Sequence, residues 1–331
     1  MVRIGVIVTN AAAAAPTHTT VHLVVAALEA GHQVDVFEPW DFEVTETGRL
    51  QGRALRLHTP LPHGGVVQAL HSRASLRRGI ALDDLDLLLL RANPYHDAIL
   101  TFAQLAQSAG VRVVNDPRSL PHTSHKAYVA TLPGVPRPRT LITRSRASAL
   151  AFAADCPAGV VVKPARACGG RGVSLARGPR RLHGIDEAMR RASAASGDRY
   201  TVVQEYLPEA AAGERRLLWL DGELLGGYLR QRAPGDFRHN LKVGGQPLPC
   251  RLDATDAALC DALSPHLVRD GVRFAGIDVI GGRVVEVNTL NPGGAHYTEQ
   301  YTGVPVARRI LAALRDPLPA PRPPPLAPQI R

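Results

Sequence analysis

Oxygen-bearing side chains gather near the end of the sequence, in a stretch that reads as two short strands joined by a tight turn. Gly281-Gly282 separates two β-prone runs, which is a pattern typical of a hairpin. Glu286 and Asn288 are two residues apart on the second run and therefore share one face, while Asp278 lies on the partner run. These oxygens suit Mg²⁺ when phosphates supply its other ligands. The alternative is a solvated hairpin with ordinary surface polar residues.

Lysine is rare in this arginine-rich chain and occurs only as Lys126, Lys163 and Lys242. A compact ammonium group is well suited to phosphate oxygens, so each lysine is a candidate phosphate ligand. Lys163 ends a valine-rich strand, and a glycine-rich loop follows it. Glycines allow backbone N–H groups to approach phosphates and allow a loop to close as a lid. The alternative is a simple hairpin turn, since the order of lysine and glycines differs from a Walker A loop.

Arginines mark two further candidate anion sites. Arg91 follows a strand expected at residues 85–90, and ligands of open α/β sheets gather at the carboxyl ends of strands. Arg91 is thus a candidate for holding a substrate carboxylate, although it could also simply close the strand. Arg230, Arg232 and Arg238 crowd a loop that leads to Asn240, which indicates an anion site or, alternatively, a flexible basic loop.

Composition narrows the class of protein. A chain of 331 residues can hold two or three domains, and no apolar run reaches the length of a membrane helix, about 18 residues. No signal peptide is visible, so we expect a cytoplasmic protein. The four cysteines show no metal spacing and read as reduced thiols. The net charge of +10 invites a nucleic-acid partner, but the basic residues are dispersed and aromatic content is only 5%, which argues against one.

The elements that must position these residues follow a mixed pattern. A strand at 2–8, a helix at 20–30 and a strand at 34–37 predict a parallel sheet with covered faces. Further strands are expected at 85–90, 111–114, 139–143, 160–163, from 201 and at 223–230. Further helices are expected at 96–109, 118–130, 146–154, 184–195, 253–270 and 304–314. We expect an N-terminal parallel-sheet domain at 1–120, a small lid subdomain at 121–200, a larger subdomain at 201–315, and a Pro-rich, disordered tail at 316–331.

The order of these motifs resembles the ATP-grasp superfamily, and within it bacterial glutathione synthetases and the related glutamate ligases that modify ribosomal protein. The resemblance covers about residues 2–315, and its most specific pieces are VVQEYLP, GERR, RQRAPGDFRHNLKVGG and GIDVIGGRVVEVNTLNPGG. It implies an α/β and α+β chain with an ATP-grasp fold, preceded by a Rossmann-like (preATP-grasp) parallel-sheet domain. It also implies a homo-oligomer.

The resemblance implies a role for each motif residue. The residues that would bind ATP through its phosphates, adenine edge and ribose are Lys126, Lys163, Gly169, Gly170, Gly172, Gln204, Glu205, Tyr206, Leu207 and Glu214. Those that would hold Mg²⁺ or Mn²⁺ are Asp278, Glu286 and Asn288. Those that would face the transferred phosphate and the tetrahedral intermediate are Arg216, Arg238, Asn240 and Arg232. Those that would meet a substrate carboxylate are Arg91, Gly293 and Gly294.

The implied activity is that of an ATP-dependent carboxylate–amine ligase that passes through an acyl phosphate, with an amino acid or short peptide as substrate. Two departures lie where substrates would bind: Arg91 is followed by Ala92-Asn93-Pro94 in place of an acidic residue and two prolines, and residues 288–291 read Asn-Thr-Leu-Asn. The ligase class is therefore a firmer expectation than glutathione as product. The alternatives are ligation to a peptide or protein terminus, and a non-catalytic nucleotide-binding module. A non-catalytic module would be expected to have lost a metal ligand or a phosphate-binding lysine, and this sequence retains both kinds of residue.

Overall fold

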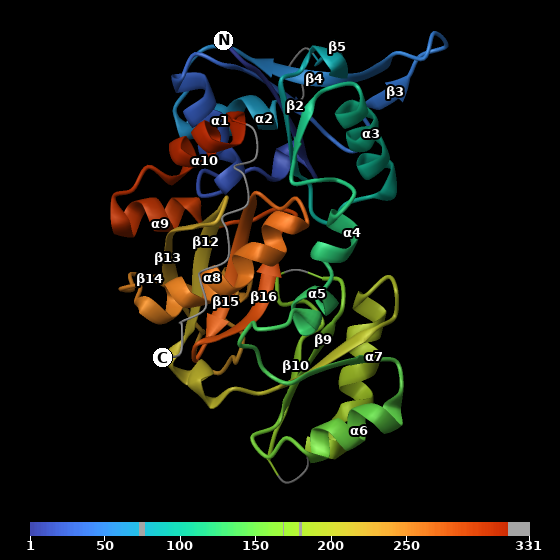
Figure 1. Cartoon of the computed structure of the whole chain (residues 1–331), viewed down its shortest axis with the longest axis vertical. Coiled ribbons are helices and arrows are strands. Elements are labelled where there is room, and N and C mark those ends of the chain that lie inside the picture. The colour runs from blue at the N-terminus through green and yellow to red at the C-terminus, as the bar shows by residue number, and fades with distance from the viewer. Residues whose placement is uncertain (73–76, 168, 179–180, 317–331) are drawn as a thin grey trace, which may run out of the picture.

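Three β-sheets organise the chain in the computed structural model, which describes residues 1–72, 77–167, 169–178 and 181–316. Figure 1 shows the sheets one after another along the long axis of the molecule, with the last sheet in sequence lying between the other two. No helix in the described ranges combines the length and the apolar character needed to cross a bilayer.

The first sheet has the strand order β3-β4-β2-β1-β6-β7, and β5 pairs with β4. The pairs β1–β2, β1–β6 and β6–β7 are parallel, which confirms the β-α-β prediction. Its strands are β1 (Arg3–Val8), β2 (Gln33–Phe37), β3 (Phe42–Val44), β4 (Leu50–Leu57), β5 (Arg77–Ala81), β6 (Leu87–Arg91) and β7 (Arg112–Val114).

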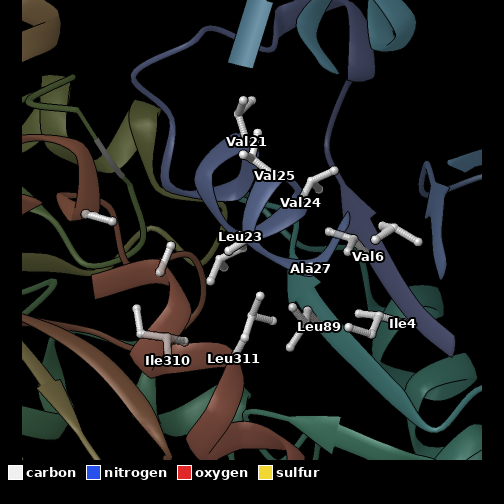
Figure 2. Packing of buried hydrophobic residues seen from close by; sticks show 14 of the residues in the cluster. Ile4, Val6, Val21, Leu23, Val24, Val25, Ala27, Leu89, Ile310 and Leu311 are labelled. Carbon is white, nitrogen blue, oxygen red and sulfur yellow. The ribbon is translucent and has the colours of Figure 1, made fainter. Parts of the chain in front are cut away.

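Helices cover both faces of this sheet, because successive residues of β1 and β6 point to opposite sides and both sides are apolar. The helices are α1 (Thr19–Glu29), α2 (His63–His71), α3 (Asp97–Ser108) and, from the end of the chain, α10 (Val306–Arg315). Figure 2 shows Ile310 and Leu311 of α10 in the same core as Ile4, Val6 and Leu89. The C-terminal helix thus completes the core of the N-terminal sheet.

The second sheet is antiparallel, with the order β10-β9-β11-β8. Its strands are β8 (Thr140–Thr143), β9 (Val160–Pro164), β10 (Ser174–Ala176) and β11 (Thr201–Glu205). Two helices, α6 (Arg146–Ala154) and α7 (Ile185–Ala195), supply the other half of its small core. Lys163 and Gln204 therefore lie near the ends of two adjacent strands.

The third sheet has the order β14-β13-β12-β15-β16 and packs against α8 (Ala254–Arg269). Its strands are β12 (Glu214–Leu220), β13 (Glu223–Gln231), β14 (Gln246–Leu248), β15 (Phe274–Ile280) and β16 (Arg283–Asn288). The predicted hairpin is confirmed: β15 and β16 are antiparallel, Asp278 is paired with Glu286, and both turn glycines have positive φ.

Two local expectations were wrong. The helix expected at 118–130 is two short helices, α4 (Leu120–Thr123) and α5 (Ala127–Thr131), because the chain turns between Ser124 and Lys126. A further helix, α9 (Ala295–Thr302), was not expected, since its sequence AHYTEQYT carries no apolar periodicity. The proposed boundary near 200 falls just before β11, which belongs to the second sheet. The predicted disordered tail lies, from residue 317, outside the described residues, as does Cys168.

Candidate functional site

A cavity of about 550 Å³ brings together segments from all three sheets. Its lining contains most of the residues singled out in the sequence: Arg91, Lys126, Lys163, Gly169, Gly170, Gln204, Glu205, Tyr206, Leu207, Glu214, Arg216, Arg238, Asn240, Asp278, Glu286, Asn288, Gly293 and Gly294. Gly172 and Arg232 do not line it. The arginine that lines the cavity from the end of β13 is Arg230, two residues before Arg232.

Asp278 is the buried centre of the charged cluster, with only 5% of its surface exposed. Arg216 donates to both of its oxygens, from Nε at 2.6 Å and from Nη2 at 3.2 Å. Arg230 Nη2 lies 2.5 Å from Oδ1. Burial acts to raise the pKa of Asp278, but the two guanidiniums hold it below its usual value. The two guanidiniums therefore favour the ionised form of this carboxylate.

The two lysines converge on the neighbouring strand β16. Lys126 Nζ is 3.5 Å from Glu286 Oε1, and it also donates to Ala167 O at 2.8 Å. Lys163 Nζ donates to Gln204 Oε1 at 3.0 Å. Burial lowers the pKa of Lys163, and Lys126 adds to this effect while Glu286 opposes it. Two ammonium groups beside one carboxylate leave positive charge for an incoming anion.

The donor set at the hairpin fits Mg²⁺ held partly by phosphates. Asn288 Nδ2 lies 3.3 Å from Asp278 Oδ2, so the amide adjoins the carboxylate that faces Glu286 across the strand pair. Among the described residues no three or more His, Cys, Asp or Glu side chains are grouped so as to hold a metal ion by themselves. Mg²⁺ typically uses one or two carboxylates and takes its other ligands from water and substrate phosphates.

Glu214, at the start of β12, is buried against Arg230, which donates to its Oε1. Burial raises the pKa of the Glu214 carboxyl to about 7, although Arg230 acts to lower it. The folded protein therefore keeps this group protonated at a pH where the unfolded chain, with an ordinary value of about 4.3, has lost the proton.

This difference predicts how stability depends on pH. At pH values between the unfolded and folded pKa values, Glu214 keeps its proton in the folded state and has lost it in the unfolded state. The contribution of Glu214 to the free energy of unfolding is therefore full below the unfolded pKa and is lost as pH rises through about 7. We expect the difference in free energy of unfolding between wild type and Glu214→Gln to shrink by on the order of 2 kcal/mol from about pH 5 to about pH 8. Urea denaturation at both pH values measures it. The exposed Glu46 supplies the control, Glu46→Gln, and a pH-independent difference at position 214 would contradict the expectation.

The glycine loop lies against the loop that carries Arg238 and Asn240. Arg238 Nη1 donates to Gly170 O at 3.1 Å. A Cβ at Gly170 would come within 2.8 Å of Asn240 Oδ1, and its φ of +77° is one that side-chain-bearing residues rarely adopt. Glycine at this position therefore allows the loop to close onto Arg238 and Asn240. Gly172 instead packs against Pro164 and Ala195, outside the cavity.

The strand that leaves the second sheet forms one wall of the cavity. Tyr206 and Leu207 are buried there, and Tyr206 N–H donates to Gly159 O at 3.0 Å. Glu205 N–H donates to Arg139 O at 2.9 Å. The segment from Glu205 to Leu207, the hinge that leads from the second sheet to the third, is thus held by hydrogen bonds to the second sheet.

The N-terminal sheet also contributes to the wall of the cavity. Arg91 is buried, donates to Thr20 Oγ1 at 3.1 Å and to Pro292 O at 2.9 Å, and lines the cavity. Burial lowers its pKa. Gly294 N–H donates to Thr19 Oγ1 at 3.0 Å, so this amide already has a protein acceptor.

The site residues that the sequence did not point to also line the cavity. They are Thr17, His18, Thr19, Thr20, Tyr228, Arg230 and Tyr297. The sequence predicts only that this N-terminal segment leads into the helix expected at 20–30, and it presents Arg230 only as one of three crowded arginines. Knowledge of the strand register would have found Arg230, because it pairs with Glu214.

Comparison with known proteins identifies the family. The prokaryotic glutathione synthetase N-terminal domain matches residues 2–120, and the prokaryotic glutathione synthetase ATP-grasp domain matches residues 125–303. Glutathione synthetase of Synechococcus elongatus is 33% identical over 92% of this chain and 95% of its own length. Glutathione synthetase of Vibrio cholerae is 31% identical over 71% of this chain and 74% of its own length.

Solved structures show the same fold at low sequence identity. The D-Ala:D-Ser ligase VanG of Enterococcus faecalis is 17% identical, with a TM-score of 0.66 over 95% of this chain and 99% of that one. D-Cycloserine synthetase DcsG has the same TM-score over 94% of this chain and 98% of its own. These likenesses confirm the ATP-grasp fold. The chain belongs to the prokaryotic glutathione synthetase family and is an ATP-dependent carboxylate–amine ligase that forms C–N bonds and releases ADP.

Proposed function

We propose that this ligase joins the carboxylate of a short peptide to the amine of an amino acid, with γ-glutamylcysteine and glycine as the pair that forms glutathione. The observation that carries the proposal is one cavity that is lined both by Asp278, Glu286 and two lysines and by Arg91. The curated relatives are themselves glutathione synthetases, which supports this pair first.

ATP occupies the part of the cavity between the second and third sheets in this proposal. Lys126 and Lys163 bind its phosphates, and the loop with Gly169 and Gly170 closes over them. The hinge from Glu205 to Leu207 contacts the adenine edge, and Glu214 accepts from the ribose hydroxyls. A carboxyl group whose pKa is near 7 can serve this role in either protonation state, because each state accepts a hydrogen bond.

Asp278, Glu286 and Asn288 would hold the divalent metal ion, which we propose is Mg²⁺. The ion would offset the negative charge of the phosphates during transfer. Arg216 and Arg230 keep Asp278 ionised and oriented, as their hydrogen bonds to it show. We propose Arg230, which lines the cavity, for the contact with the tetrahedral intermediate that the family resemblance implies for Arg232.

The chemistry needs two displacements. A carboxylate oxygen attacks the γ-phosphorus of ATP, the bond to the β,γ-bridging oxygen breaks, and ADP leaves. The amine nitrogen then attacks the acyl carbon, the bond to the phosphate oxygen breaks, and phosphate and one proton leave as the amide forms. Arg238 and Asn240, which line the cavity, would stabilise the transferred phosphate. The glycine loop that closes on them excludes water, which would otherwise hydrolyse the acyl phosphate.

The test is ADP release with ATP and Mg²⁺ against a panel of carboxylates and amines. We expect release to require γ-glutamylcysteine and glycine together and to disappear in Glu286→Ala. Release with a different pair would reassign the substrates and keep the ligase. Release only with acidic peptides or protein termini would favour the alternative, ligation to a polypeptide end. Failure to bind ATP in the presence of Mg²⁺ would overturn the assignment of the nucleotide site.

A further inference from the structure

The helix α1 of the N-terminal sheet is bound to the start of α9 through one buried hydroxyl. Thr19, 3% exposed, accepts from Gly294 N–H at 3.0 Å and from Ala295 N–H at 3.1 Å through its Oγ1. The first N–H groups of a helix have no partner within the helix and need an acceptor from elsewhere. Here the acceptor comes from a residue 275 positions earlier in the chain. Thr19 therefore caps α9 across the junction of the N-terminal and third sheets.

The pair Gly293-Gly294, which precedes α9, is also held from inside the cavity. Arg216 Nη1 donates to Gly293 O at 3.2 Å while its Nε and Nη2 bind Asp278. Gly294 has φ +126°, and a Cβ on it would come within 3.0 Å of the Tyr228 ring. The conformation of the pair Gly293-Gly294 thus depends on contacts from two directions, and Thr19 supplies the contact from the N-terminal side.

A second contact ties the same loop to the same helix. Arg91 donates to Thr20 Oγ1 at 3.1 Å and to Pro292 O at 2.9 Å, which joins the end of β6, the start of α1 and the loop before α9. Thr19, Thr20, Arg91 and the glycine pair all line the cavity. A change in this junction therefore acts directly on the part of the cavity wall that these residues form.

We propose that Thr19 is a positioning residue, which fixes Gly293-Gly294 as the wall against which the carboxylate substrate binds. The proposal rests on the proposed function, because it places that substrate beside Arg91. Loss of the hydroxyl leaves two amide N–H groups without their acceptor and frees the loop. Arg216 keeps its two bonds to Asp278, so we expect the residues proposed to bind ATP and metal to stay in place.

Thr19→Val removes the hydroxyl with little change in shape, and Thr19→Ser retains it. Thr298 gives a matched control: it lies on α9, is fully buried, and its Oγ1 has no hydrogen-bond partner among the described residues. We expect Thr19→Val to raise the KM for the carboxylate substrate roughly 10-fold to 100-fold, the range expected for losing one or two buried hydrogen bonds. The KM for ATP should stay within about twofold. Thr19→Ser and Thr298→Val should resemble wild type in both constants.

Amide hydrogen exchange provides a readout that needs no substrate. Peptides that span residues 290–296 should exchange faster in Thr19→Val than in wild type, Thr19→Ser or Thr298→Val. Unchanged exchange in Thr19→Val overturns the proposal even if no substrate pair is active. An equal rise of both KM values also overturns it, because it would indicate general destabilisation. A wild type that lacks activity with every pair refutes the proposed function separately, while the exchange result still decides the role of Thr19.

Discussion

Replacing Glu286 by glutamine is expected to lower the rate of ADP release by about 1,000-fold, which corresponds to the loss of about 4 kcal/mol of transition-state stabilisation. Glutamine has nearly the same shape but no negative charge. Glu286 faces Asp278 across the β15–β16 pair, and Lys126 lies 3.5 Å from it. Without its charge, the proposed metal site keeps one carboxylate, and the two lysines lose the anion that partly balances them.

Titration with Mg²⁺ and Mn²⁺ distinguishes a metal ligand from a structural residue. We expect Glu286→Gln to require a much higher metal concentration for its residual activity and to unfold at nearly the wild-type urea concentration. Glu209 offers a matched control, since it lies against the turn of the same hairpin near Gly281 and does not line the cavity. Glu209→Gln should retain wild-type activity. A Glu286→Gln enzyme with wild-type turnover and metal dependence would refute the metal assignment.

The sequence could predict the metal hairpin because the relevant physics is local. A Gly-Gly turn fixes which residues of the two strands face each other, and the twofold period of a strand fixes which residues share a face. The structure accordingly pairs Asp278 with Glu286 and brings Asn288 beside them. The position of Lys163 could be predicted in the same way, because it lies near the end of a strand and the glycine loop follows that strand.

Arg230 and Thr19 could not be predicted in the same way, since their roles depend on partners distant in sequence. Arg230 still lies within β13, where pairing with Glu214 directs it to the cavity, whereas Arg232 follows the end of the strand. Nothing in the spacing of the arginines reveals where the strand ends. Thr19 acts through α9, a short polar helix without an apolar stripe, and only the folded chain places the two together.

Helix α10 illustrates the same limit on a larger scale. Its apolar stripe predicts a buried helix, but not the sheet that it covers. The structure places Ile310 and Leu311 against the core of the first sheet, so the two ends of the described chain share one core (Figure 2). This packing brings the start of α1 close to the start of α9, which is the junction that Thr19 occupies.

Arg230→Met is expected to lower the free energy of unfolding by about 3–5 kcal/mol, the range found when one partner of a buried ion pair is removed. Arg230 is 4% exposed and contacts the carboxylates of both Glu214 and Asp278. Burial acts to lower the pKa of Arg230, but these two carboxylates raise it above its usual value, so they are its dominant partners. Methionine fills a similar volume without charge and leaves Glu214 with no cation at that contact.

The direction of the pH dependence makes this prediction specific. Without Arg230, the pKa values of the Glu214 and Asp278 carboxyl groups in the folded state move upward. Burial opposes their ionisation, and one guanidinium fewer remains to offset that effect. The variant should therefore lose further stability relative to wild type as pH rises from about 5 to about 8. Urea denaturation measures this, with Arg309→Met as control: its partner Glu223 is 3.6 Å away at the surface, so its effect should be within about 0.5 kcal/mol. Adding Glu214→Gln to Arg230→Met removes one of the unpaired charges and should restore part of the lost stability at high pH. If the double variant is no more stable than Arg230→Met there, the cost of burying the Glu214 carboxylate beside Asp278 is not what Arg230 relieves.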